Sequence, residues 1–219
     1  MATDRIAGRG RPRGTSARAL EVIALRLFAD HGFEEITVER IATAAGVSRR
    51  TFFRYFDSKS DVLWHNFDNE VRDLRAALAA SSPDEPPLEA IRAAVLAVNR
   101  YTAADVPELR TRMGLLATTP ALAASALAHY DSWELAVIEF AASRLGQQPY
   151  DLVPTAIGRA TLAVCRAAYE LWLRRADADL TAYLDRALRL MAAGFHDPDR
   201  ADAVIARTSR GAPNGHARR

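Results

Sequence analysis

Apolar residues recur every three or four positions along most of residues 16–195, and this period is typical of amphipathic helices. No segment alternates apolar and polar residues for long enough to predict a strand. The 219 residues include 10 prolines and 11 glycines, too few to interrupt long helices often. The sequence therefore predicts an all-α fold of about nine helices.

The predicted helices begin and end at residues with capping chemistry. Gly32 and Gly46 follow the first two helices, and Ser48 can cap the third. Residues 58–61 (Ser-Lys-Ser-Asp) have the capping-box pattern that opens the fourth. On the first helix we expect one buried face, formed by Leu20, Ile23, Ala24, Leu27 and Phe28. The predicted spans are about 16–31, 38–45, 49–56, 58–80, 88–102, 105–117, 120–145, 153–174 and 178–193.

Charge is unevenly distributed along the chain. Residues 1–59 carry 11 basic and 7 acidic side chains, whereas residues 60–195 carry 13 basic and 17 acidic ones. A basic end joined to an acidic body is expected when that end binds a polyanion such as DNA.

Cys165, the single cysteine, excludes an intramolecular disulfide and fits a reducing compartment. It stands in an apolar helix, so we expect a buried side chain rather than a redox sensor. No apolar stretch follows the basic N-terminus, and none approaches the ~20 residues that span a bilayer. We expect a cytoplasmic protein with no membrane segment.

Residues that would carry catalysis are missing. The sequence has no nucleophile elbow, no phosphate-binding loop and no His/Cys cluster with metal-ligand spacing, and its five histidines are scattered. We therefore expect neither an enzyme nor a cofactor or metal site.

Two short helices separated by Gly46 predict a helix-turn-helix. The second of them carries arginines, which can bond guanine, and hydroxyl groups, which can reach bases or phosphates. Phe52 and Phe56 are expected to face inward. The alternative is a short solvated helix on a small helical core. The candidate DNA-binding residues of this helix are Ser48, Arg49, Arg50, Thr51, Phe53, Arg54 and Tyr55.

Residues 16–63 resemble the N-terminal domain of the TetR family of bacterial regulators. The resemblance rests on Leu-Phe-Ala-Asp-His-Gly-Phe at 27–33, Ala-Gly-Val-Ser at 45–48, Phe-Phe-Arg-Tyr-Phe at 52–56 and Ser-Lys-Ser-Asp-Val-Leu at 58–63. It implies phosphate contacts from Thr37 and from Lys59, the only lysine of the chain. Phe53 departs from the pattern, because the family usually has tyrosine there.

The resemblance also implies a division of the chain into a reader and a larger domain. We expect a disordered basic arm at 1–15, a helix-turn-helix domain at 16–60, a ligand-binding and dimerisation domain at 61–195, and a disordered tail at 196–219.

The arm contains Arg9, Arg11 and Arg13 in an Arg-Gly-Arg-Pro context that resembles an AT-hook. Such an extended, arginine-rich segment suits the narrow minor groove of A·T tracts. A solubilising tail is the alternative.

The larger domain is expected to hold an effector among its aromatic side chains, with Arg110 binding an anionic head group. Plain core packing of the aromatic residues and a solvated Arg110 are the alternatives. Residues 52–56, the helix over 88–100 with its Val-Asn-Arg end, and residues 167–173 resemble the TetR-type regulators of the mycofactocin system. This resemblance implies a long-chain acyl-CoA effector. The candidate ligand-binding residues are Trp64, Phe67, Arg110, Met113, Trp133, Phe140 and Trp172.

The last two helices are expected to form a homodimer seam, because the family pairs two helices from each subunit. Small residues on one helix and an apolar face on the other would meet their copies, although a self-contained monomer core remains the alternative. The candidate interface residues are Ala160, Ala163, Ala167, Leu180, Tyr183, Leu184, Leu188 and Met191.

Together these features predict a ligand-responsive transcription factor, a repressor released from a palindromic double-stranded operator by its effector. A helical small-molecule carrier and an effector-independent architectural DNA binder are the alternatives.

Overall fold

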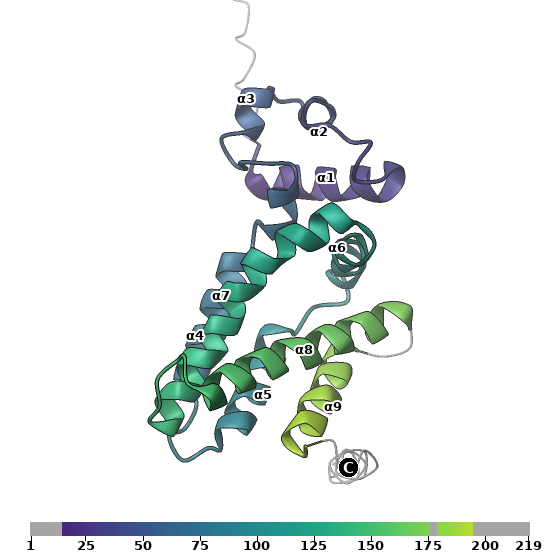
Figure 1. Cartoon of the computed structure of the whole chain (residues 1–219). Helices are drawn as coiled ribbons and strands as arrows, with labels where there is room; N and C mark the ends of the chain where they lie inside the picture. Colours follow the sequence, from purple (N-terminus) through teal and green to yellow (C-terminus); the bar gives the residue numbers. More distant parts are fainter. Residues whose placement is uncertain (1–14, 176–178, 195–219) are drawn as a thin grey trace, which may run out of the picture. The chain divides into compact units, whose positions relative to one another are not determined.

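The computed structural model describes residues 15–175 and 179–194. These residues form nine α-helices and one 3-10 helix, η1, and include no strand, so the all-α prediction is confirmed (Figure 1). The elements are α1 (Ala17–His31), α2 (Val38–Ala44), α3 (Arg49–Phe52), η1 (Ser60–Trp64), α4 (Phe67–Ala79), α5 (Pro87–Val98), α6 (Val106–Thr118), α7 (Pro120–Leu145), α8 (Leu152–Arg174) and α9 (Leu180–Ala192).

The chain divides into two compact units between His65 and Asn66. The N-terminal unit holds α1, α2, α3 and η1, and α1 packs against both α2 and η1. Its core is made of apolar side chains that are at most 1% exposed: Leu20, Phe28, Ile36, Ile41, Phe52, Val62 and Leu63.

The buried face of α1 differs in part from the prediction. Leu20, Ala24 and Phe28 are buried as expected, but Leu25 is buried where Ile23 and Leu27 had been expected. The face is therefore rotated slightly around the helix axis, because α1 is covered by both α2 and η1 rather than by one neighbour.

The C-terminal unit is a bundle of α4 to α9. Its longest helices, α7 and α8, pack against each other, α9 packs on α8, and α4 contacts both α5 and α7 (Figure 1). Its core is centred on Leu74, Ile91, Val137, Trp172 and Leu184, all at most 1% exposed. Gly158 allows the close approach of α7 and α8, since a Cβ there would lie 2.3 Å from Ile138 Cγ1.

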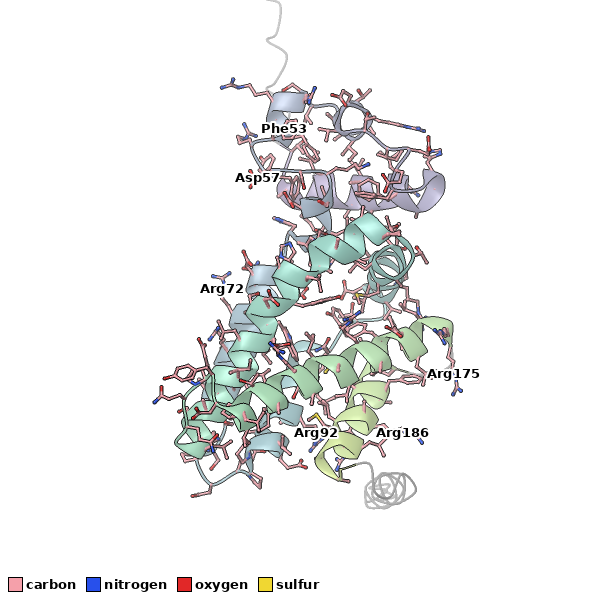
Figure 2. The ribbon with its side chains drawn as sticks, viewed as in Figure 1. Phe53, Asp57, Arg72, Arg92, Arg175 and Arg186 are labelled. Atoms are coloured by element: carbon pink, nitrogen blue, oxygen red, sulfur yellow. The ribbon has the colours of Figure 1, made fainter. Side chains whose placement is uncertain are left out.

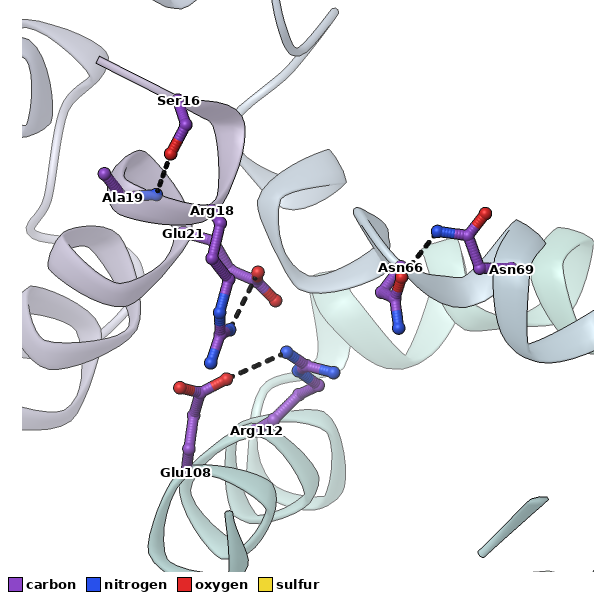
Figure 3. Close-up of polar contacts among 8 residues, drawn as sticks. All are labelled: Ser16, Arg18, Ala19, Glu21, Asn66, Asn69, Glu108 and Arg112. Carbon is purple, nitrogen blue, oxygen red and sulfur yellow. Dashed lines mark hydrogen bonds and ion pairs between the residues drawn. The ribbon is translucent and has the colours of Figure 1, made fainter. Parts of the chain in front are cut away.

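Local side-chain bonds lie in the first turns of α1 and α4. Ser16 caps α1 by accepting a hydrogen bond from the Ala19 amide at 3.1 Å, and Arg18 pairs with Glu21 on the same helix (Figure 3). In the other unit, Asn69 donates to Asn66 in the first turn of α4.

Two predicted helices were wrong in extent. The helix expected over 58–80 is η1 followed by α4, and the helix expected over 49–56 ends at Phe52. The capping box at 58–61 does form, with the Ser58 amide donating to Asp61 Oδ2 at 2.7 Å. Residues 60–64 wind as the 3-10 helix η1, with Val62, Leu63 and Trp64 all buried, and a new helix starts at Phe67.

Candidate functional site

The turn between α2 and α3 is a tight glycine turn. Gly46 has φ +66°, in the left-handed region that favours glycine, and the Val47 amide donates to Ala42 O at 2.9 Å. This bond ends α2 and turns the chain at once into α3. Since α2 and α3 also pack against each other, the two elements form a helix-turn-helix.

Hydroxyl caps begin both helices of this motif. Thr37 Oγ1 accepts from the Arg40 amide at 3.2 Å, and Ser48 Oγ accepts from the Thr51 amide at 3.1 Å. Ser48 Oγ also lies 2.9 Å from Thr51 Oγ1. These three predicted DNA-binding residues thus have a local structural role that orients the motif.

The outer side of α3 and the turn after it form a hollow of about 380 Å³ lined by Arg50, Thr51, Phe53 and Arg54. Arg50, Phe53 and Arg54 are exposed and Thr51 is half-buried. The structure therefore gathers four of the predicted DNA-reading residues around one concave surface, which we call the reading surface.

Arg49 stands beside the reading surface rather than free of partners. Its Nη1 lies 2.8 Å from Glu39 Oε1 on α2, and its guanidinium lies 5.3 Å from the centre of the Phe53 ring. The pKa of Glu39 is lowered, mainly by its backbone hydrogen bond at the start of α2 and to a smaller extent by Arg49. Both side chains are exposed, so the pair is held loosely.

Tyr55, also predicted to bind DNA, does not line the reading surface. Its hydroxyl donates to Thr15 O at 2.6 Å and accepts from Arg54 Nη2 at 3.0 Å. The reason is the early end of α3, which places Tyr55 in a turn and brings its phenol to the start of α1. Tyr55 therefore ties the turn after α3 to Thr15.

Lys59 is also held within the N-terminal unit. Its ammonium donates to Phe33 O at 2.7 Å and lies 4.0 Å from the centre of the Phe33 ring. Lys59 as a whole is half-buried. The predicted arm residues Arg9, Arg11 and Arg13 lie outside the described residues.

The C-terminal unit has an apolar cavity between α6, α7 and α8, with a volume of about 80 Å³. Met113, Tyr130, Tyr169 and Glu170 line it together with several leucines and alanines. Arg166 also lines it and lies 5.7 Å from the Tyr130 ring centre. Sequence reasoning missed Arg166, because an arginine on an amphipathic helix carries no signal that it borders a cavity.

A buried hydrogen-bond chain lies beside this cavity. Tyr169 Oη donates to Asn99 Oδ1 at 2.5 Å, and Asn99 Nδ2 donates to Val95 O at 2.8 Å. Tyr101 hydrogen-bonds with Tyr169; burial, more than the nearby Glu70 carboxylate, raises the pKa of Tyr101 to about 12. Burial also raises the pKa of Tyr169 well above its usual range, so both phenols stay protonated.

Arg110 caps a helix instead of standing free for a ligand. Its guanidinium donates to Trp172 O and Arg175 O, each at 3.0 Å, and lies 4.0 Å from the Trp172 ring centre. Both carbonyls lie at the C-terminal end of α8: Trp172 O also accepts from the Arg175 amide at 3.2 Å, and Arg175 is the residue that caps the helix. Arg110 and Trp172 border a second hollow of about 360 Å³ with Tyr101 and Leu180. Arg112, two residues further along α6, pairs with Glu108 (Figure 3).

The other predicted ligand-binding residues are dispersed. Met113 lines the cavity between α6, α7 and α8, whereas Phe67, Trp133 and Phe140 pack against the core of the C-terminal unit. Trp64 belongs to η1, is 7% exposed, and groups with the N-terminal unit rather than with the other predicted ligand-binding residues.

The predicted dimer seam is only partly available at the surface. Leu180, Leu184 and Leu188 are at most 3% exposed and fill the core of their own subunit, which corrects their assignment to an interface. Tyr183 and Met191 are half-buried against the same core. On α8, in contrast, the small residues Ala160, Ala163 and Ala167 are all exposed along one face.

Within the described ranges there is no cluster of three or more His, Cys, Asp or Glu side chains suited to a metal ion. In the same part of the chain, every helix is too short or too polar to cross a membrane.

Comparison with known proteins agrees with the helix-turn-helix geometry. Residues 23–64 match the family model of bacterial regulatory proteins of the tetR family, and the chain belongs to this family of DNA-binding transcriptional regulators. Residues 85–196 match a narrower model, the MftR C-terminal domain. The family resemblance seen in the sequence is thereby confirmed.

The most informative relative is described as a mycofactocin biosynthesis transcriptional regulator, MftR of Mycobacterium tuberculosis. It is 35% identical over 186 residues, which cover 85% of this chain and 94% of that protein. Two solved structures share the fold. FadR of Bacillus halodurans has a TM-score of 0.64 at 18% identity and covers 85% of this chain and 99% of that one. FadR of Thermus thermophilus, in complex with lauroyl-CoA, has a TM-score of 0.53 at 24% identity, covering 81% and 93%.

Proposed function

We propose that this protein is a repressor that binds a palindromic operator as a homodimer and leaves it when an acyl-CoA binds the C-terminal unit. The observation that carries the proposal is the reading surface, where two exposed guanidinium groups, Arg50 and Arg54, flank an exposed ring on a helix-turn-helix. Such a helix fits the major groove, where arginine bonds guanine through two hydrogen bonds.

Phosphate contacts supply the remainder of the affinity. Lys59 and the helix N-termini capped by Thr37 and Ser48 are the candidates. With about four phosphates per subunit, the slope of log affinity against log salt is about −7 for a dimer.

Dimerisation is supported by the exposed small-residue face of α8. Ala160, Ala163 and Ala167 allow close approach of a second α8, and the two-fold symmetry of such a pair matches a palindrome.

The effector class is supported by the relatives and by the cavity between α6, α7 and α8. The leucine, alanine and aromatic side chains of the lining suit an acyl chain, and Arg166 suits an anionic group, with the Glu170 carboxylate also at the cavity. At about 80 Å³ the cavity is smaller than the roughly 300–1,000 Å³ of ordinary ligand sites, so binding has to part these helices.

Parting the helices moves α4, because α4 packs on α7 and continues the chain from the helix-turn-helix unit. A coupling of about 1–3 kcal/mol would weaken operator binding about 5–150-fold.

The DNA-binding half of the proposal is tested by fluorescence anisotropy with DNA from upstream of the protein's own gene and with scrambled DNA at the same salt. Wild-type protein is expected to prefer the native DNA, and Arg50→Ala to lose most of that preference. Arg26 is an exposed arginine of α1, and Arg26→Ala is the matched control. It should leave the ratio of the affinities for native and scrambled DNA unchanged. Equal binding to both DNAs by the wild type, with acyl-CoA still bound, would instead indicate a carrier.

The effector half is tested by titrating oleoyl-CoA into the protein and following tryptophan fluorescence. Arg166→Met is expected to weaken binding at least several-fold, whereas Arg174→Met, an exposed arginine at the end of α8, should not. Unchanged affinity in Arg166→Met would remove Arg166 from the effector site.

A further inference from the structure

Phe53 is an apolar side chain at the centre of a charged surface. Its ring is 41% exposed, although the neighbouring Phe52 and Phe56 are buried and already fill the space beneath α3. The core therefore does not need Phe53. Phe53, labelled in Figure 2, shares the lining of the reading surface with Arg50, Thr51 and Arg54, which suggests a role in what that surface binds.

The ring is held in one place by its neighbours. Phe52 meets it edge-to-face with ring centres 5.5 Å apart, and the Arg49 guanidinium lies 5.3 Å from its centre on another side. Arg49 is itself paired with Glu39, so it acts as a side wall. The remaining open part of the ring borders the hollow of about 380 Å³.

A phenyl ring has no hydrogen-bond donor or acceptor. In the major groove the base edges offer donors and acceptors almost everywhere, and the 5-methyl group of thymine is the apolar feature that a phenyl ring can contact. A sugar–phosphate contact would leave the ring against a strongly polar surface, which is less favourable than covering a methyl group.

We propose that Phe53 reads a thymine in each half-site of the operator by packing its ring against the thymine 5-methyl group. The inference rests on the proposed function, since it requires that α3 enters the major groove. It assigns to Phe53 a specificity role at one base pair, while Arg50 and Arg54 contact guanine or phosphate.

The expected effect follows from the burial of one methyl group. Removing such a contact weakens binding about fourfold, or about 15-fold when both half-sites of a two-fold operator lose it. Replacing thymine by deoxyuridine removes the methyl group and leaves every hydrogen-bonding group of the base in place.

The experiment begins by selecting an operator from randomised DNA with the wild-type protein. Each symmetric pair of thymines is then replaced by deoxyuridine, and the affinities are measured at one salt concentration for wild type, Phe53→Ala and Phe53→Leu. Melting temperatures confirm that the variants fold, as expected for an exposed position.

At one thymine pair, replacement by deoxyuridine is expected to lower the DNA affinity of the wild type about 15-fold. The same replacement should leave the affinity of Phe53→Ala unchanged and should lower that of Phe53→Leu by a smaller factor. If no thymine methyl group matters to the wild type, or if its effect persists in Phe53→Ala, the inference is overturned while sequence-specific binding stands. If no DNA is enriched in the selection, the proposed function itself fails, and this inference with it.

Discussion

Replacing Gly158 by alanine tests the closest helix contact of the C-terminal unit. A Cβ at this position of α8 would lie 2.3 Å from Ile138 Cγ1 and 3.2 Å from Glu134 O, both on α7. Cγ1 is next to the branch point of isoleucine, and the other atom is backbone, so neither can yield without moving α7. Gly114, on α6, is the matched control, because nothing lies within 4 Å of a Cβ built there.

The magnitudes follow from two opposing effects. Alanine in place of glycine within a helix stabilises the fold by about 1 kcal/mol, and overpacking of a filled site costs about 1–3 kcal/mol. Gly114→Ala is therefore expected to raise the free energy of unfolding by about 1 kcal/mol. Gly158→Ala is expected to lower it by up to about 2 kcal/mol, so the two variants differ by about 1–3 kcal/mol.

Thermal unfolding followed by circular dichroism measures this difference. For a chain of 219 residues it corresponds to melting temperatures roughly 3–10 °C apart, with Gly114→Ala the higher. The protein concentration has to be the same for both variants, because dimerisation raises the melting temperature by mass action. Equal stabilisation by the two substitutions would refute the described packing of α7 against α8.

Three other predictions concern the C-terminal unit. Arg110→Met removes the hydrogen bonds to the last carbonyls of α8. In denaturant titrations it is expected to lower the free energy of unfolding by about 1–3 kcal/mol. The control variant Arg100→Met, at an exposed position, should leave that free energy unchanged. Burial raises the pKa of the Cys165 thiol to about 12, so a disulfide reagent at pH 8 should modify it only after unfolding; rapid labelling of native protein would contradict its burial. The pKa of Tyr101, about 12 against a usual 10, means that the folded state keeps a proton that the unfolded state loses. Stability should therefore be level below about pH 9 and fall as pH rises from about 10 to 12, and Tyr101→Phe should flatten this fall.

The presence of the helices could be predicted from the spacing of the apolar residues and from the positions of glycine and proline. The clearest case is α7, whose limits at Pro120 and Leu145 agree with the prediction because proline suits a first turn and Gly146, with φ +65°, ends the helix. The break between η1 and α4 was not predictable, because the capping box at 58–61 is also a valid start for one long helix.

The sequence predicted the parts of the candidate site that depend on the chemical type of the residues. It did not predict the parts that depend on how the helices pack. The reading surface follows from the residue types of α3 and the turn after it. In contrast, the apolar stripe of α9 has the same sequence pattern whether it covers its own core or a partner, and Leu184 shows that it covers its own. Arg110 looked like an anion-binding group, because sequence cannot show that it bonds the last carbonyls of α8.

The central claim is that effector binding and operator binding are coupled through one protein. It is tested most directly by measuring operator affinity by fluorescence anisotropy across a titration of oleoyl-CoA, and then oleoyl-CoA affinity with and without operator DNA. Oleoyl-CoA is expected to weaken operator binding about 5–150-fold, and the operator to weaken oleoyl-CoA binding by the same factor. Operator affinity that stays constant while oleoyl-CoA saturates the protein would contradict it.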